Sequence, residues 1–129
     1  ASVVGGNLKC VESLLGTPWQ LKTNNKFLFL EDIGERGYQV DRMFEHMVQA
    51  GGLKGCKAIL LGDFITGDEP NGKNYVRAAL MRFAAATNIP VFDGMSTGHG
   101  KGQRMLPLGT KAVLKVQTQA ELTVKAVSL

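Results

Sequence analysis

A histidine among glycines is the residue of this sequence with the clearest potential for chemistry. His99 lies in the stretch DGMSTGHGKGQRMLPLG, which spans residues 93–109. The surrounding glycines are Gly94, Gly98, Gly100 and Gly102. Glycine permits backbone angles that other residues avoid, so the stretch predicts a tight loop able to approach a ligand closely. A phosphate-binding loop is excluded, because Met95 stands where that motif requires its first glycine. His99 is either a catalytic base or an exposed loop residue.

A histidine that acts as a base usually needs a carboxylate to fix its tautomer and stabilise its cation. Glu31 is the best candidate, because it ends the apolar run FLFLE and functional groups gather at the ends of buried α/β strands. The alternative is that Glu31 and Asp32 only charge the start of the following helix, a role that suits Asp32 and Glu35 better. A partly buried Glu31 would need a partner. We therefore pair Glu31 with His99.

A second acidic group lies in the stretch LGDFITGDEPNGKN. It comprises Asp63, Asp68 and Glu69. A calcium-binding loop requires oxygen ligands at alternating positions, a central glycine and a distal glutamate, and the order here does not meet that pattern. We interpret the group as a surface turn.

The remaining reactive side chains are assigned structural roles. His46 falls on the polar side of a predicted helix and is expected at the surface. Arg42 lies early in the same helix, next to Asp41, where it could pair with a neighbouring acid. Cys10 and Cys56 lack metal-ligand spacing, so we expect both to be reduced and mostly buried thiols.

Apolar patterns predict the elements that must position these residues. Continuous or alternating apolar runs predict strands, and apolar residues at helical spacing predict helices. Predicted strands cover 2–4, 26–32, 57–63, 89–92, 111–116 and 121–127, and predicted helices begin after Asn7 and span 40–48 and 76–84. Alternating strands and helices followed by a β-hairpin indicate an α/β domain with a mixed sheet.

Composition limits the classes of function. A chain of 129 residues with 44% hydrophobic residues fits one domain with one core. Its apolar runs are too short to span a membrane. The net charge of +4 comes from scattered lysines, so nucleic-acid binding is only weakly supported. The sequence begins without an initiating Met or a signal-peptide pattern, and we interpret it as a piece of a longer protein.

Several motifs occur in the order seen in one family. They are GGNL, LLGTPW, FLFLEDIGERGYQVDRM, GGLKGCKAILLGDF and GHGKGQRMLPLGTKAVL. The chain resembles the LD-carboxypeptidase family of serine peptidases, which includes muramoyl-tetrapeptide carboxypeptidases and microcin-immunity peptidases. The resemblance covers nearly the whole chain and corresponds to the family's C-terminal domain, a swivelling β/β/α-type domain. It implies a separate flavodoxin-like N-terminal domain that carries the nucleophilic serine.

The resemblance assigns roles to the two residues selected above. Glu31 of LED matches the triad acid, and His99 of GHG matches the triad base. The chain contains no G-x-S-x-G motif, so residues 1–129 are expected to be inactive alone. The implied reaction of the whole enzyme is release of the terminal D-alanine from murein tetrapeptides. No metal or organic cofactor is implied.

The resemblance also implies partners and leaves alternatives. It implies a murein peptide substrate, the N-terminal domain of the same protein, a homodimer and a cytoplasmic location, with no nucleic acid or membrane. One alternative is an immunity peptidase that cleaves an acyl-sulfamoyl or peptidyl nucleotide, for which Trp19 could stack on the base. The other is a non-catalytic binding module.

Overall fold

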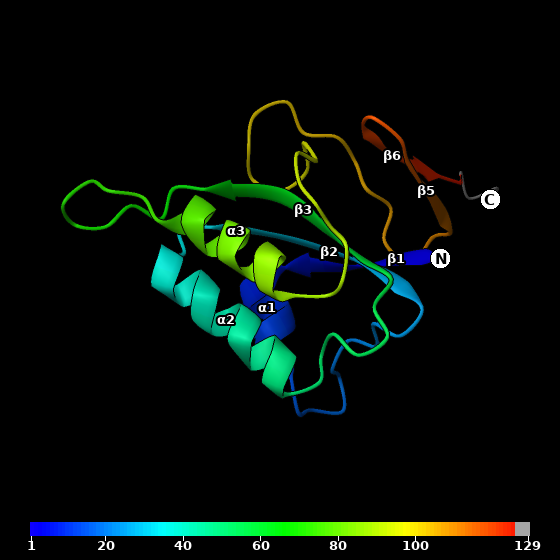
Figure 1. Ribbon diagram of the computed structural model, residues 1–129, viewed down its shortest axis with the longest axis horizontal. Coiled ribbons are helices and arrows are strands. Elements are labelled where there is room, and N and C mark those ends of the chain that lie inside the picture. Colours follow the sequence, from blue (N-terminus) through cyan, green and yellow to red (C-terminus); the bar gives the residue numbers. More distant parts are fainter. Residues whose placement is uncertain (126–129) are drawn as a thin grey trace.

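A four-stranded parallel sheet lies at the centre of the computed structural model, which describes residues 1–125 (Figure 1). The strand order is β1-β2-β3-β4. The strands are β1 (Ser2–Asn7), β2 (Lys26–Ile33), β3 (Ala58–Ile65) and β4 (Val91–Phe92). The connecting helices are α1 (Leu8–Ser13), α2 (Gly37–Gln49) and α3 (Val76–Ala86). An antiparallel hairpin of β5 (Ala112–Val116) and β6 (Ala120–Val124) follows.

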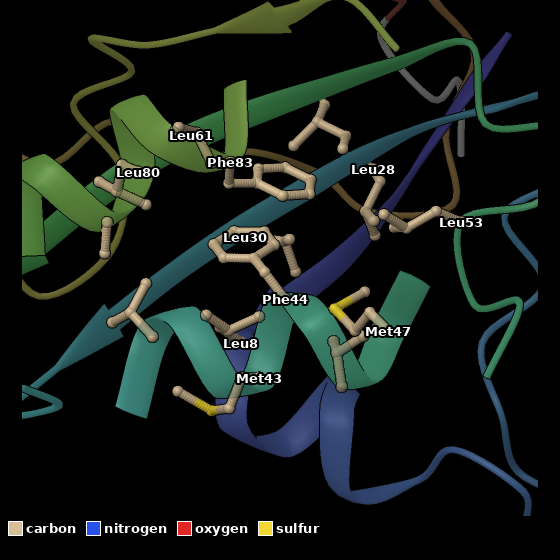
Figure 2. Packing of buried hydrophobic residues seen from close by; sticks show 14 of the residues in the cluster. Leu8, Leu28, Leu30, Met43, Phe44, Met47, Leu53, Leu61, Leu80 and Phe83 are labelled. Carbon is tan, nitrogen blue, oxygen red and sulfur yellow. The ribbon is translucent and has the colours of Figure 1, made fainter. Parts of the chain in front are cut away.

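The three helices cover one face of the sheet (Figure 1). Leu28 and Leu30 of β2 point toward the helices and pack in a core with Phe44 of α2 and Phe83 of α3 (Figure 2). The rings of Phe44 and Phe83 stack with their centroids 4.0 Å apart. This layer follows directly from the helical spacing of apolar residues in the sequence.

The opposite face of the sheet is covered by irregular chain and by the hairpin (Figure 1). Phe27 and Phe29, which alternate with the leucines along β2, form a second core with Leu60 and Ala112. Leu106, from the loop before the hairpin, packs against this core. β2 is therefore buried on both faces, as its continuous apolar run predicts.

The predicted α/β class and C-terminal hairpin are confirmed. Parallel and antiparallel pairing are divided between two sheets, which an isolated antiparallel bridge from Ser2 to Lys111 connects. Asn7 caps α1 as predicted, and its Oδ1 accepts a hydrogen bond from Cys10 N at 3.1 Å. The last predicted strand was expected to reach residue 127, and residues 126–127 lie outside the described part of the chain.

The two cysteines differ in environment. Cys56 is buried, and burial raises the pKa of its thiol. Cys10 is exposed, so the prediction that it is buried is wrong. α1 turns Leu8 and Val11 inward, which leaves Cys10 on the outer side of this short helix. Both thiols are free.

Candidate active site

Two carboxylates meet where β2 and β3 end. Leu30 pairs with Leu61 and Asp32 pairs with Phe64, so the register shifts between these two pairs. Glu31 therefore lies opposite two residues of β3, Gly62 and Asp63. Such bulges bend a strand and redirect its side chains, and they are frequent beside active sites. Here the bulge lies beside Glu31 and Asp63, and both side chains contact the loop of residues 93–109.

The structure brings the two predicted site residues into contact. His99 Nδ1 lies 2.7 Å from Glu31 Oε2, so the predicted proximity is confirmed. The side chain of Glu31 is 8% exposed, whereas that of His99 is 48% exposed. With Glu31 ionised, Nδ1 carries the proton and donates it, because a carboxylate can only accept a hydrogen bond. Nε2 is then the nitrogen with a free lone pair, as a general base requires.

Glycines allow the His99 loop to lie directly on the two strand ends. Gly98 has a φ of +136°, and a Cβ at this position would lie 2.9 Å from Glu31 Oε2. A Cβ at Gly100 would lie 2.6 Å from Asp63 Oδ2, and one at Gly62 would lie 2.3 Å from Thr97 O. The glycine spacing seen in the sequence thus serves the close approach of His99 to Glu31 rather than the binding of a phosphate.

Asp63 belongs to this site, and its assignment to a surface turn is wrong. Gly100 directly follows His99 in the chain, and its N–H donates a hydrogen bond to Asp63 Oδ2 at 3.0 Å. Asp68 and Glu69 do lie in the predicted loop, where they contact Asn74 and Arg36 respectively. One signal in the sequence separates them, because Asp63 directly follows an apolar run, as Glu31 does.

Asp32 faces the helical side of the sheet, away from His99. Its carboxylate accepts hydrogen bonds from Asn7 Nδ2 at 2.8 Å and from Lys9 N at 3.0 Å. It therefore holds the start of α1, which corrects the expectation that it charges the start of α2. Glu35 also pairs with Lys9, at 2.7 Å. This hydrogen bond and the negative charge of Glu35 raise the pKa of Lys9.

The other candidates lie away from the site. His46 pairs with Glu12 of α1, so this surface histidine links two helices. The ion pair expected for Arg42 is instead formed by Asp41, which contacts Arg82 of α3. Within residues 1–125, no group of three or more His, Cys, Asp or Glu side chains is arranged to hold a metal ion.

A shallow depression of about 320 Å³ adjoins the Glu31–His99 pair. Glu31, Gly98 and Arg104 contribute to its wall, together with Met105, which is 99% exposed. A larger groove of about 720 Å³ lies between α2 and α3, on the other side of the sheet. Of these two hollows, the depression is the one whose lining includes Glu31.

Comparisons with known proteins agree on one family. Residues 1–114 match the C-terminal domain of LD-carboxypeptidases. A probable murein peptide carboxypeptidase of Bacillus subtilis (strain 168) is 31% identical over 128 residues, which make up 98% of this chain and 40% of that protein. The chain spans 29% to 40% of the length of the curated relatives that it matches first.

Solved structures point to the same domain. The crystal structure of muramoyltetrapeptide carboxypeptidase from Oxalobacter formigenes matches with a TM-score of 0.86 and 33% identity, over 98% of this chain and 44% of that one. The microcin C7 self-immunity protein in complex with aspartyl sulfamoyl adenosine matches with a TM-score of 0.80 and 26% identity, over 98% of this chain and 38% of that one.

Proposed function

The chain belongs to the LD-carboxypeptidase family, whose C-terminal domain it matches, and we propose that it supplies Glu31 and His99 to a serine-type enzyme that releases the terminal D-alanine of murein tetrapeptides. The 2.7 Å contact between a buried strand-end carboxylate and a half-exposed histidine carries the proposal. In this arrangement Glu31 fixes Nδ1 of His99, and Nε2 is left free to accept the proton of the nucleophile. It is the arrangement that a triad needs from its acid and base.

In the proposed reaction, a serine outside this chain attacks the amide that joins diaminopimelate or lysine to D-alanine. His99 Nε2 takes the proton from the serine hydroxyl as the new C–O bond forms. Glu31 holds the ring through Nδ1 and stabilises the imidazolium. His99 then returns the proton to the amine of D-alanine as the C–N bond breaks. Water, activated by the same nitrogen, hydrolyses the ester and frees the shortened peptide and the serine.

The proposal assigns residues 1–129 to a C-terminal domain. The nucleophile and the oxyanion donors come from an N-terminal domain that faces the His99 loop, which accords with the exposed Met105 beside the depression. The homodimer and the cytoplasmic location expected from the sequence remain part of the proposal. Within residues 1–125, the structure has no helix with the length and apolar character that a bilayer crossing requires.

A second candidate is an immunity peptidase that cleaves an aminoacyl sulfamoyl nucleotide. The similarity to the self-immunity protein in complex with aspartyl sulfamoyl adenosine favours it. Trp19 does not, although it is 80% exposed and free to stack. It lies in the segment that leads into the start of β2, whereas Glu31 lies near the end of that strand, at the opposite edge of the sheet. The murein peptide remains the preferred substrate.

The test uses the full-length protein and measures D-alanine release from a murein tetrapeptide. His99→Ala should lower kcat by at least about 10³-fold, because a triad without its base retains only binding and oxyanion stabilisation. His46→Ala is the matched control, since this histidine also contacts a glutamate but lies on the helical layer, and its kcat should stay within about threefold of wild type.

Three results would contradict the proposal. A kcat for His99→Ala within tenfold of wild type would remove His99 from the mechanism. Cleavage of aspartyl sulfamoyl adenosine in preference to the tetrapeptide would establish the immunity peptidase instead. Failure of the wild-type protein to cleave either substrate, while it still binds one of them, would indicate a binding module.

A further inference from the structure

We propose that Asp63 is a positioning residue that holds the His99 loop so that Nε2 points at the nucleophile. This inference rests on the proposed function, because it concerns the accuracy with which the same base is placed. Asp63 is partly buried at the end of β3, beside the bulge opposite Glu31. It acts on His99 through the backbone of the loop.

Asp63 holds the loop on both sides of His99. Its backbone N–H donates a hydrogen bond to Thr97 O at 2.8 Å, two residues before the histidine. Its Oδ2 accepts a hydrogen bond from Gly100 N at 3.0 Å, one residue after it. One residue near the end of β3 thereby holds the loop backbone shortly before and directly after His99.

Few other side chains hold this loop from outside. Among the described residues, the side chains outside the loop that hydrogen-bond positions 94–104 are those of Glu31 and Asp63. Glu31 binds the ring of His99 itself, whereas Asp63 binds the backbone on which the ring is carried. The remaining side-chain bonds of this segment, such as Thr97 Oγ1 to Arg104 O at 3.0 Å, lie within the loop.

The packing around Asp63 requires the loop to lie against it. A Cβ at Gly98 would lie 3.1 Å from Asp63 Cβ, and one at Gly100 would lie 2.6 Å from Asp63 Oδ2. Both flanking residues are therefore glycines at places where any side chain would move the carboxylate. A bond from a backbone N–H to a carboxylate is also stronger than one between neutral groups.

Loss of the anchor should misplace the base rather than remove it. A displacement of about 1 Å in a catalytic group can cost roughly 10²-fold in rate. In the full-length protein, Asp63→Ala should lower kcat for D-alanine release by about 10- to 100-fold, with KM within threefold of wild type. Asp68→Ala is the matched control, because it removes an aspartate that contacts Asn74 in the neighbouring loop, and its kcat should not change.

Asp63→Asn separates positioning from a direct effect of charge. Asparagine keeps an oxygen that can accept from Gly100 N but removes the negative charge. Positioning predicts that Asp63→Asn recovers kcat to within about fivefold of wild type and leaves the pH midpoint of kcat/KM unchanged. A role of charge predicts no recovery and a lower pH midpoint, since a nearby anion favours the imidazolium.

Histidine ¹⁵N NMR of the full-length protein gives a readout that does not depend on turnover. The Nδ1–H signal of His99 should be sharp in the wild type and in Asp63→Asn, and broadened or shifted in Asp63→Ala. Should Asp63→Ala not fold, Gly100→Ala carries the test, because its Cβ forces the same hydrogen bond apart. The expected loss in kcat is again about 10- to 100-fold.

The outcomes distinguish this inference from the proposed function. An inactive His99→Ala together with a fully active Asp63→Ala would overturn the positioning role and leave the triad intact. An Asp63→Asn variant as impaired as Asp63→Ala, with a shifted pH profile, would also overturn it. A His99→Ala variant that keeps wild-type turnover would overturn the proposed function itself.

Discussion

The two faces of the parallel sheet are covered in different ways, and neighbouring carboxylates on β2 show the consequence. Asp32 faces the helices, where an amide side chain and a helix-start N–H satisfy its oxygens. Glu31 faces the loop, where its hydrogen-bond partner is His99. Both are buried. One carboxylate has fixed donors and stabilises the fold, whereas the other has a partner that can gain and lose a proton.

Burial alone therefore does not identify a carboxylate suited to catalysis. The nature of the partner does, because backbone and amide donors cannot take part in acid–base chemistry near neutral pH. The covering layer also matters. Regular helices seal one face with apolar side chains, whereas a glycine loop leaves the histidine on the other face half exposed.

Isosteric substitutions of Glu31 and Asp32 should show the largest difference between the two faces. Glu31→Gln should lower kcat of the full-length enzyme by about 10²- to 10⁴-fold, because the imidazolium loses its counter-charge. Asp32→Asn should leave kcat within about threefold but lower the free energy of unfolding by about 1–3 kcal/mol, because its NH₂ group meets donors. The measurements are D-alanine release and urea denaturation of each variant.

These two variants serve as controls for each other, since each removes one buried negative charge and keeps the shape of the side chain. If both lost activity to the same degree, the two faces would not differ in function. If Glu31→Gln were as active as wild type, Glu31 would not be the triad acid.

A core substitution on the helical face should affect stability alone. Phe44 is fully buried and stacks on Phe83, so Phe44→Ala should lower the free energy of unfolding by about 3–5 kcal/mol. Below its unfolding transition, kcat should match that of wild type, because the site lies beyond the sheet. A lower kcat in fully folded protein would show that the helical layer positions the site.

A glycine substitution on the loop face should have the opposite effect, because it should lower kcat. Gly98→Ala forces a Cβ against Glu31 Oε2 at a φ of +136°, so kcat should fall by about 10- to 100-fold. Gly102→Ala is the control. It also has positive φ, +71°, but a Cβ there meets no atom within 4 Å, so it carries only the backbone strain. Equal losses in the two variants would assign the effect to strain in the loop.

The two thiols should react at different rates, which is the smallest of the expected effects. Exposed Cys10 should be alkylated in native protein well before Cys56, whose pKa is raised by burial. The folded state holds the Cys56 proton more tightly than the unfolded state. The Cys56 thiol therefore contributes fully to the free energy of unfolding below the pKa that it has in the unfolded state. This contribution is lost as pH rises through the pKa that it has in the folded state. Mass spectrometry of partly labelled protein measures the rates, with urea-unfolded protein as the control, and equal native rates would contradict the assignment.

The sequence was sufficient to predict most of the elements and the contact between Glu31 and His99. Apolar runs such as FLFLE gave strand β2, and helical spacing gave α2 and α3, because burial of these faces drives both. Glu31 followed from its place at a strand end, and His99 from its glycine neighbours. These signals are local in the sequence.

The features that sequence reasoning missed depend on contacts between distant segments. Asp63 was grouped with Asp68, because the register shift that turns it toward Gly100 depends on strand pairing. Asp32 was placed at the start of α2, whereas strand pairing brings β2 beside the start of α1. Cys10 was expected inside, but α1 is only six residues long and buries just Leu8 and Val11.

A double-mutant cycle on Glu31 and His99 tests most directly the claim that the two act as one unit. D-alanine release is measured for the full-length wild type, Glu31→Gln, His99→Ala and the double variant. If Glu31 acts only through the His99 ring, the double variant should have the same kcat as His99→Ala, within about twofold. A double variant whose losses multiply, so that kcat falls a further 10²-fold or more below that of His99→Ala, would contradict the account.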